Sequence, residues 1–316
     1  MSGSHAYSEM HKQGELARRA KEAAAHLAHC DLCPRHCGAD RASGQFGVCR
    51  IGDRAVVSSY GPHFGEESVL VGSGGSGTVF FAGCNLLCSF CQNADISHGL
   101  EGMPVDSAGL AEIFLFIQRR GCSNLNLVTP THVVPMWLEA LDTACKKGFD
   151  LPLVYNCGGY ESVKTLTLLD GVVDIYMPDF KFADTAVAEE FCQASDYPER
   201  AKEAFAEMHR QVGDLVTDDR GLAVSGLLVR HLVMPEGLAG TSEVMSFLAE
   251  KISRDTYVNI MDQYRPCHMA YRHPKAKRRP TGQEIQEAIQ AAADAGIYRL
   301  DEKPRSFVLR KKWFDE

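Results

Sequence analysis

Three cysteines, Cys84, Cys88 and Cys91, stand in the order C-x3-C-x2-C within residues 83–93. Cysteine thiolates are the usual ligands of iron–sulfur clusters, and a four-iron cluster needs four ligands. Because this loop supplies only three, one iron is left open to bind a small chelating molecule. Zinc usually takes its fourth ligand from a second paired motif close by, and the next cysteine, Cys122, is isolated. The spacing therefore favours a [4Fe-4S] cluster over a zinc knuckle or buried structural thiols.

A second set of cysteines precedes the first. Cys30, Cys33, Cys37 and Cys49 follow the pattern C-x2-C-x3-C-x11-C. Four thiolates can close a tetrahedral site, so we predict a second metal centre with a structural or electron-relaying role. The spacing does not distinguish zinc from an iron–sulfur cluster. Four unrelated buried thiols are the alternative interpretation.

The composition narrows the class of protein. Charged residues make up 23% and hydrophobic residues 45% of the 316 residues, as in soluble globular proteins. The net charge of -8 argues against a general nucleic-acid binder, because proteins that track phosphates carry a basic surplus. No apolar run approaches the roughly 18 residues that span a bilayer, and the N-terminus lacks the charged-then-apolar layout of a secretion signal. We therefore predict a cytoplasmic protein with no membrane partner, whose cysteines are metal ligands or buried thiols rather than disulfides.

Beyond Cys91 the chain alternates strand-like and helix-like segments. Strands are predicted at residues 79–81, 124–128, 151–155, 173–177, 225–233 and 257–261. Helices are predicted at residues 107–120, 133–147, 160–169, 183–194, 199–212 and 242–252. This alternation indicates a parallel sheet with right-handed crossovers. The predicted fold class is α/β, a partial (β/α)6 barrel with a small N-terminal Cys-rich metal-binding extension.

We predict three parts along the chain. Residues 1–60 contain a helix at 8–29, a strand at 56–60 and the four-cysteine segment. Residues 61–300 form the partial barrel, and residues 301–316 form a C-terminal tail.

Two loops before the first barrel strand invite other interpretations. His63, Glu66 and Glu67 could suggest a metal site. We instead expect them to be exposed in a turn-rich connection over residues 61–67, because one imidazole and two exposed carboxylates lack the fixed geometry that a metal site needs. Residues 72–77 satisfy G-x-G-x-x-G but precede a strand instead of following one, so they fail the context of a dinucleotide-binding loop. We interpret them as a turn into the first barrel strand.

Polar side chains follow the predicted barrel strands at the ends where chemistry is found in such folds. Ordinary loop polarity explains any one of them, but their repetition at several strand ends favours a binding site beside residues 83–93, the cluster loop. The candidates are Thr129 and Thr131 after the second strand, Asn156 after the third, Asp179 and Lys181 after the fourth, and Arg230 on the fifth.

The cluster spacing, with Phe90 just before its last cysteine, resembles the signature of the radical S-adenosylmethionine (SAM) enzymes. A wider set of motifs is similar to radical SAM proteins of the pyruvate formate-lyase activating enzyme type and spans residues 30–300. These motifs are Cys30-x2-Cys33-Pro34-Arg35-x-Cys37, Tyr60-Gly61-Pro62-His63, the cluster loop, Thr129-Pro130-Thr131-His132 and Asp262-Gln263-Tyr264-Arg265-Pro266. One departure is that the Gly-Gly-Glu segment of true glycyl radical activases is replaced by Thr129-Pro130-Thr131, which weakens any transfer of the activase function.

The resemblance implies a radical SAM barrel with Cys84, Cys88 and Cys91 as ligands of a [4Fe-4S] cluster and SAM on the open iron. Phe90 is then expected at the adenine edge. Arg230 is a candidate for the SAM carboxylate, because a guanidinium fork suits a carboxylate, and Asn156 and Asp179 are candidates for the ribose or the methionine end. The other candidate cofactor-binding residues are Thr129, Thr131 and Lys181.

Three functions remain open. In the first, reductive cleavage of SAM to a 5′-deoxyadenosyl radical activates or modifies a protein or peptide. In the second, the radical acts on a small metabolite. In the third, the protein is a non-catalytic iron–sulfur or zinc sensor or scaffold. Both enzyme functions need a reductant such as flavodoxin or ferredoxin, and converging polar groups beside an open iron favour them over a scaffold.

Overall fold

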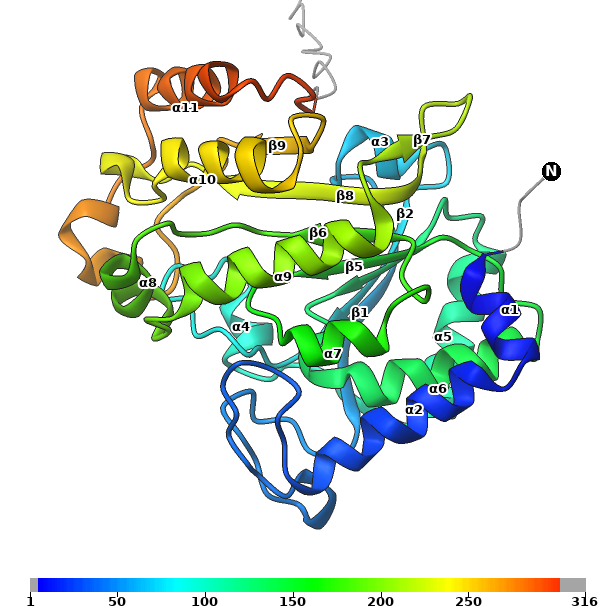
Figure 1. Cartoon of the computed structure of the whole chain (residues 1–316). Helices are drawn as coiled ribbons and strands as arrows, with labels where there is room; N and C mark the ends of the chain where they lie inside the picture. Colours follow the sequence, from blue (N-terminus) through cyan, green and yellow to red (C-terminus); the bar gives the residue numbers. More distant parts are fainter. Residues whose placement is uncertain (1–4, 302–316) are drawn as a thin grey trace, which may run out of the picture.

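The structure is a computed structural model that describes residues 5–301. A mixed nine-stranded sheet runs through the molecule in the order β3-β1-β2-β4-β5-β6-β8-β7, with β9 paired to β8. Figure 1 shows helices packed around this sheet. The two ends of this order, β3 and β7, are not paired with each other, so the sheet is open. The predicted α/β class is therefore confirmed at the level of an open mixed sheet with helices packed around it.

Six strands pair in parallel in chain order, as predicted from the alternating pattern. They are β2 (Ser76–Phe81), β4 (Leu125–Val128), β5 (Leu153–Cys157), β6 (Ile175–Pro178), β8 (Ala223–Leu232) and β9 (Tyr257–Met261). The residues of β5 and β6 are all buried, as expected for parallel strands covered on both faces. Their apolar stretches, 153–155 and 175–177, explain why the pattern located them.

Three antiparallel strands complete the sheet. β1 (Ala55–His63) pairs with both β2 and β3 (Met103–Val105), and β7 (Val216–Thr217) pairs with β8. The prediction of a turn over residues 61–63 is wrong, because β1 continues alongside β2 as far as His63. The predicted boundary between residues 60 and 61 therefore falls inside one strand of the sheet.

Most helices lie where periodicity predicts them. The longer ones are α1 (Ala6–Lys12), α2 (Glu15–Ala25), α5 (Ser107–Arg119), α6 (Val134–Cys145), α7 (Val163–Leu168), α8 (Thr185–Cys192), α9 (Tyr197–Val212), α10 (Thr241–Phe247) and α11 (Gly282–Ala295). The single helix predicted over residues 8–29 is divided at Gly14, whose φ of 75° is left-handed and suits glycine. α11 was not predicted, although its Thr281–Glu284 capping box is a recognisable start signal.

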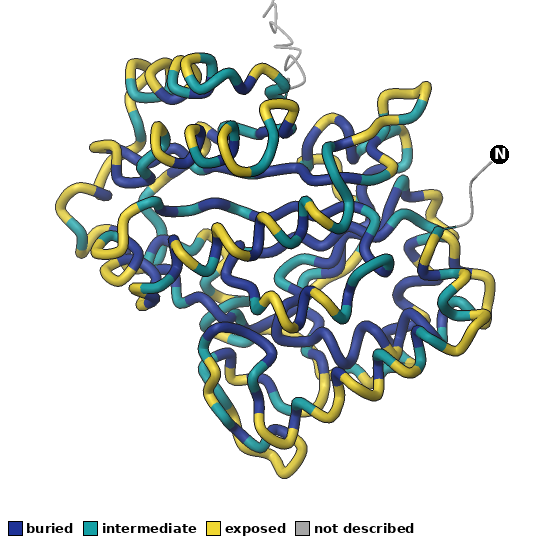
Figure 2. Tube along the Cα trace, in the orientation of Figure 1, coloured by how far each residue is buried: buried dark blue, intermediate teal, exposed yellow. Residues whose placement is uncertain are grey.

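The N-terminal helix α2 packs on the outside of the helical layer. α2 packs against α6, and α10 packs against α11 (Figure 1). The central strands β2, β4, β5 and β6 are almost continuously buried (Figure 2). No helix within residues 5–301 is long and apolar enough to cross a membrane. Except for Asp301, the predicted C-terminal tail lies outside the described residues.

Candidate functional site

A cavity of about 470 Å³ opens where the six parallel strands end. Its size is typical of a small-molecule site. The six strands and the residues just beyond them contribute Phe81, Thr129, Asn156, Cys157, Asp179, Lys181, Arg230, Leu232, Met261 and Gln263. The topology therefore brings the predicted strand-end groups together around one cavity.

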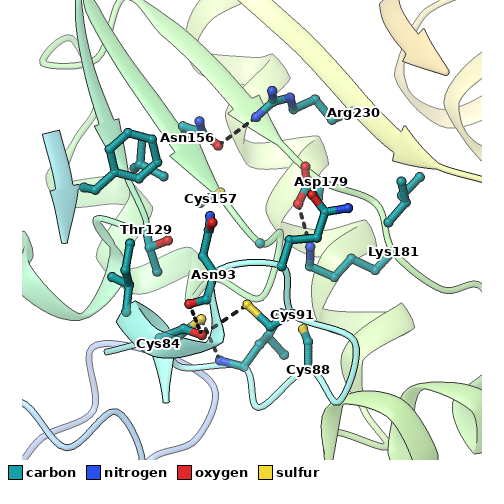
Figure 3. A pocket seen from close by; sticks show the side chains of 18 of the residues that line it. Cys84, Cys88, Cys91, Asn93, Thr129, Asn156, Cys157, Asp179, Lys181 and Arg230 are labelled. Atoms are coloured by element: carbon teal, nitrogen blue, oxygen red, sulfur yellow. Dashed lines mark hydrogen bonds and ion pairs between the residues drawn. The ribbon is translucent and has the colours of Figure 1, made fainter. Parts of the chain in front are cut away.

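The cluster loop forms another wall of this cavity. Cys84, Cys88 and Cys91 all line it, and Figure 3 shows them facing the hollow opposite the strand-end polar groups. The loop is held in place because the Asn85 side chain donates to the Tyr160 carbonyl at 2.6 Å. The cysteines thus share one cavity wall on an anchored loop.

Each thiol has a different environment. Burial raises the pKa of Cys84 and Cys91 above the ordinary value. The Cys88 sulfur lies 3.4 Å from the sulfur of Cys192 at the end of α8, and this hydrogen bond lowers the pKa of Cys88. Lys181 lowers it further. Cys192 was not predicted as a site residue, since nothing in its local sequence connects it to the loop.

The donor set fits an iron–sulfur cluster by its chemistry, because all three groups are thiols on one cavity wall. Among residues 5–301, however, no three His, Cys, Asp or Glu side chains are gathered closely enough to hold a metal ion. The sulfurs therefore line the cavity without forming a closed ligand set.

Phe90 fixes the far end of the loop. Its ring lies edge-on to Phe182 with the ring centroids 5.7 Å apart, and it also contacts Phe191 and Tyr264. Edge-to-face pairs of this kind are favourable beyond the area they bury. Phe90 also lines the cavity, so its ring forms an apolar wall there.

Asp179 and Lys181 form an ion pair in the cavity, with Nζ 2.5 Å from the carboxylate oxygen (Figure 3). Burial opposes the charge of Lys181, but Asp179 and Cys88 together raise the pKa of Lys181 well above its ordinary value. Lys181 is therefore a cation that faces the cluster loop. Cations of this kind favour an anionic ligand or a thiolate nearby.

Arg230 is held by two buried carboxylates. Its Nε donates to Glu67 at 2.7 Å, and its terminal nitrogen lies 3.3 Å from Glu66. The Glu66 and Glu67 side chains are only 6% and 0% exposed, so the prediction that they are exposed is wrong. β1 and the short helix α3 (Ser68–Val71) bring this segment against β8 and β9, where Asn259 also donates to Glu67.

The remaining guanidinium nitrogen of Arg230 lies 3.4 Å from the Asn156 side-chain oxygen (Figure 3). Asn156 and Arg230 both line the cavity. The predicted cation is therefore at the cavity, but two of its three nitrogens are already committed to carboxylates.

The two predicted threonines have different positions. Thr129 lines the cavity with a left-handed φ of 60°, which is uncommon for a β-branched residue. Thr131 does not line the cavity; its hydroxyl is buried and donates to Glu161 at 2.7 Å. Thr131 therefore binds a buried side chain outside the cavity wall, and it does not lie with the other candidate cofactor-binding residues.

Glu161 is a buried acid that sequence reasoning missed. Its side chain accepts hydrogen bonds from Thr131 and from the Tyr155 hydroxyl, and only 1% of the residue is exposed. Burial raises the pKa of Glu161 to about 7, although these hydrogen bonds act in the opposite direction. Between pH 4.5 and about 7, Glu161 therefore keeps a proton in the folded protein that it would release in the unfolded chain.

This acid should make stability depend on pH. Below a pH of 4.5, the ordinary pKa of Glu161, both states hold the proton and the stabilising contribution is complete. Between pH 4.5 and about 7, only the unfolded chain releases it, so the free energy of unfolding falls by up to about 1.4 kcal/mol per pH unit. Glu161→Gln should flatten this slope in urea titrations, whereas Glu203→Gln at an exposed carboxylate should not. An unchanged slope in Glu161→Gln would contradict the assignment.

The second cysteine set lies around a separate small cavity. Cys30, Cys33 and Cys49 are buried and Cys37 is exposed, and all four line this cavity. The structure therefore brings the predicted set together, again without gathering three ligands closely enough to hold a metal.

Comparison with known proteins gives one informative relationship. The chain is 33% identical over 283 residues to the uncharacterized protein MJ0674 of Methanocaldococcus jannaschii, and the alignment covers 86% of this chain and 76% of that protein. The chain belongs to the same protein family as MJ0674. No family model matches the sequence.

Proposed function

We propose that this protein is a radical SAM enzyme whose open sheet is a partial (β/α)6 barrel of the radical SAM type. One observation carries the proposal: all three cysteines of the C-x3-C-x2-C loop line one cavity at the ends of six parallel strands. Sites in parallel α/β folds lie at these strand ends. The cavity also contains polar groups that suit a zwitterionic ligand with a ribose.

A [4Fe-4S] cluster held by Cys84, Cys88 and Cys91 would supply the electron that cleaves SAM to a 5′-deoxyadenosyl radical, which then abstracts a hydrogen atom from the substrate. The chain's own residues would hold and orient SAM. Asn156 and the Asp179–Lys181 pair present hydrogen-bonding groups across the cavity from the loop. Arg230 would contribute through its edge nearest Asn156, because its other nitrogens bind glutamates.

The substrate is a protein, a peptide or a small metabolite, and the electron comes from a reductant such as flavodoxin or ferredoxin. Such reductants and an oxygen-sensitive cluster accord with the cytoplasmic location expected from the sequence. The polar groups that converge on the cavity favour an enzyme, because a scaffold has no need of them.

A non-catalytic iron–sulfur or zinc protein is the second candidate function, and Cys192 is the observation that favours it. Its sulfur lies 3.4 Å from Cys88, so a fourth thiolate is near enough to close the site. Cys192 is fully buried and is not part of the cavity wall. It therefore lies behind Cys88, away from the side where SAM would bind. The short distance to Cys88 supports the closed site, but this position outside the cavity counts against it.

Anaerobic reconstitution tests the proposal. We expect the loop to take up about four iron and four sulfide and, with SAM and a strong reductant, the protein to release 5′-deoxyadenosine. Mössbauer spectra should show one iron changed by SAM. If SAM does not change the spectra of the reconstituted cluster and no 5′-deoxyadenosine forms, the site is instead the closed, non-catalytic one.

A further inference from the structure

The small cavity beside the N-terminal cysteines is also lined by five residues from outside the predicted metal set, Arg41 and His132 among them. It has a volume of about 10 Å³ and is lined by Cys30, Leu32, Cys33, Arg35, Cys37, Arg41, Val48, Cys49 and His132. His132 belongs to the segment after β4, in a short 3-10 turn (Thr131–Val133). A residue distant in sequence thus reaches the cysteine set.

His132 has one buried ring nitrogen without a hydrogen-bond partner among the described residues. Its Nε2 lies 2.8 Å from the Ala82 carbonyl oxygen, and a carbonyl only accepts, so Nε2 carries the hydrogen. Nδ1 is buried and has no hydrogen-bond partner among the described residues, and the residue is 1% exposed. A buried polar atom without a partner is costly. Metal-binding histidines characteristically donate their other ring N–H to a backbone carbonyl, as His132 does.

Arg41 adds a positive charge to the wall of the small cavity. It is 1% exposed, its NH1 lies 3.6 Å from the Cys30 sulfur, and its NH2 donates to the His132 carbonyl at 2.8 Å. Within residues 5–301, Arg41 forms no ion pair with a carboxylate; its other hydrogen bonds go to the Gly52 carbonyl. Buried charges are normally compensated, and metal-bound thiolates would provide the missing negative charge.

The size of the cavity favours a single ion. A volume of about 10 Å³ corresponds to about one water-sized sphere, whereas a four-iron cluster contains several iron and sulfide atoms. Cys37 is the one exposed thiol of the set, and its sulfur packs at Gly47, where an added Cβ would lie 2.4 Å away. The buried donors are therefore three thiols and one imidazole.

We propose that one zinc ion is bound by Cys30, Cys33, Cys49 and Nδ1 of His132, with Cys37 outside the ligand set. Three sulfurs and one nitrogen make a closed tetrahedral zinc site. No three of these donors lie close enough in this structure to hold a metal, so zinc would have to draw the side chains together. The site fastens the N-terminal segment to the start of the cluster loop, because His132 also binds the carbonyl of Ala82, two residues before Cys84. It does not depend on what the larger cavity binds.

Zinc K-edge X-ray absorption on the full chain tests this site. The Cys84→Ala, Cys88→Ala, Cys91→Ala variant removes the loop thiols, so any metal present belongs to the N-terminal set. We expect one zinc per chain by elemental analysis, with sulfur at about 2.3 Å and one nitrogen at about 2.0–2.1 Å. His132→Ala should lose the nitrogen shell and bind zinc at least about tenfold more weakly in chelator competition, since even residues that only support a ligand have effects of that size.

Two neighbouring variants serve as controls. His36→Ala, at an exposed histidine between Cys33 and Cys37, should keep the nitrogen shell, and Cys37→Ala should keep the zinc. Zinc with sulfur ligands alone in the variant that lacks the three loop thiols would overturn the proposal without any histidine variant, and so would iron with sulfide bound by that variant. A folded chain that binds no metal would also overturn it.

Discussion

Cys88→Ala is expected to abolish 5′-deoxyadenosine formation from SAM under reducing conditions, whereas Cys192→Ala is expected to retain it. The two sulfurs lie 3.4 Å apart, but only Cys88 belongs to the cluster loop and lines the cavity. If the cluster takes three ligands from the loop, loss of Cys88 leaves two and the cluster is not held. The measurement is chromatographic detection of 5′-deoxyadenosine after anaerobic reconstitution.

This pair of variants distinguishes the radical SAM enzyme from a non-catalytic protein whose cluster has four thiolate ligands. Product from Cys88→Ala would rule out the loop as the catalytic cluster site. If Cys192 is a fourth ligand, Cys192→Ala should open the site and create a response to SAM that the parent protein lacks. Circular dichroism on both cluster-free variants shows whether either substitution merely disrupts folding, because both side chains are buried.

Arg230→Ala is expected to destabilise the fold by about 3–5 kcal/mol, because it leaves two buried carboxylates without their cation. Glu66 and Glu67 are 6% and 0% exposed in their side chains, so without the guanidinium their charges would be poorly solvated. Arg278→Ala is the matched control: Arg278 also binds two glutamates, but its side chain is 43% exposed. Its loss should cost less than about 1 kcal/mol. Urea unfolding of the cluster-free proteins gives both values.

A compensating variant shows whether the loss comes from the stranded charge. Arg230→Met combined with Glu66→Gln and Glu67→Gln should recover much of the stability, since replacing all charged partners costs less than removing one. A loss below about 1 kcal/mol for Arg230→Ala would show that the carboxylates are protonated or hydrated and that the ion pair does not stabilise this fold.

The sequence by itself determined the features that depend on local pattern. The six parallel strands appear in the predicted order because buried parallel strands are runs of apolar residues. The cysteine loop and most strand-end candidates then share one cavity, because parallel strands in chain order place their ends on the same edge. The spacing of Cys84, Cys88 and Cys91 is likewise local and needs no tertiary information.

Only the tertiary structure decided which distant side chains meet. Glu67 contacts Arg230, Cys192 approaches Cys88, and His132 reaches the N-terminal cysteines. Each contact joins segments separated by long stretches of chain, and local sequence composition does not predict such a contact. The same applies to the burial of Glu66 and Glu67, which polar sequence context made appear exposed. Whether a charged side chain is solvated or paired depends on what the rest of the fold packs against it, and that determines its energy.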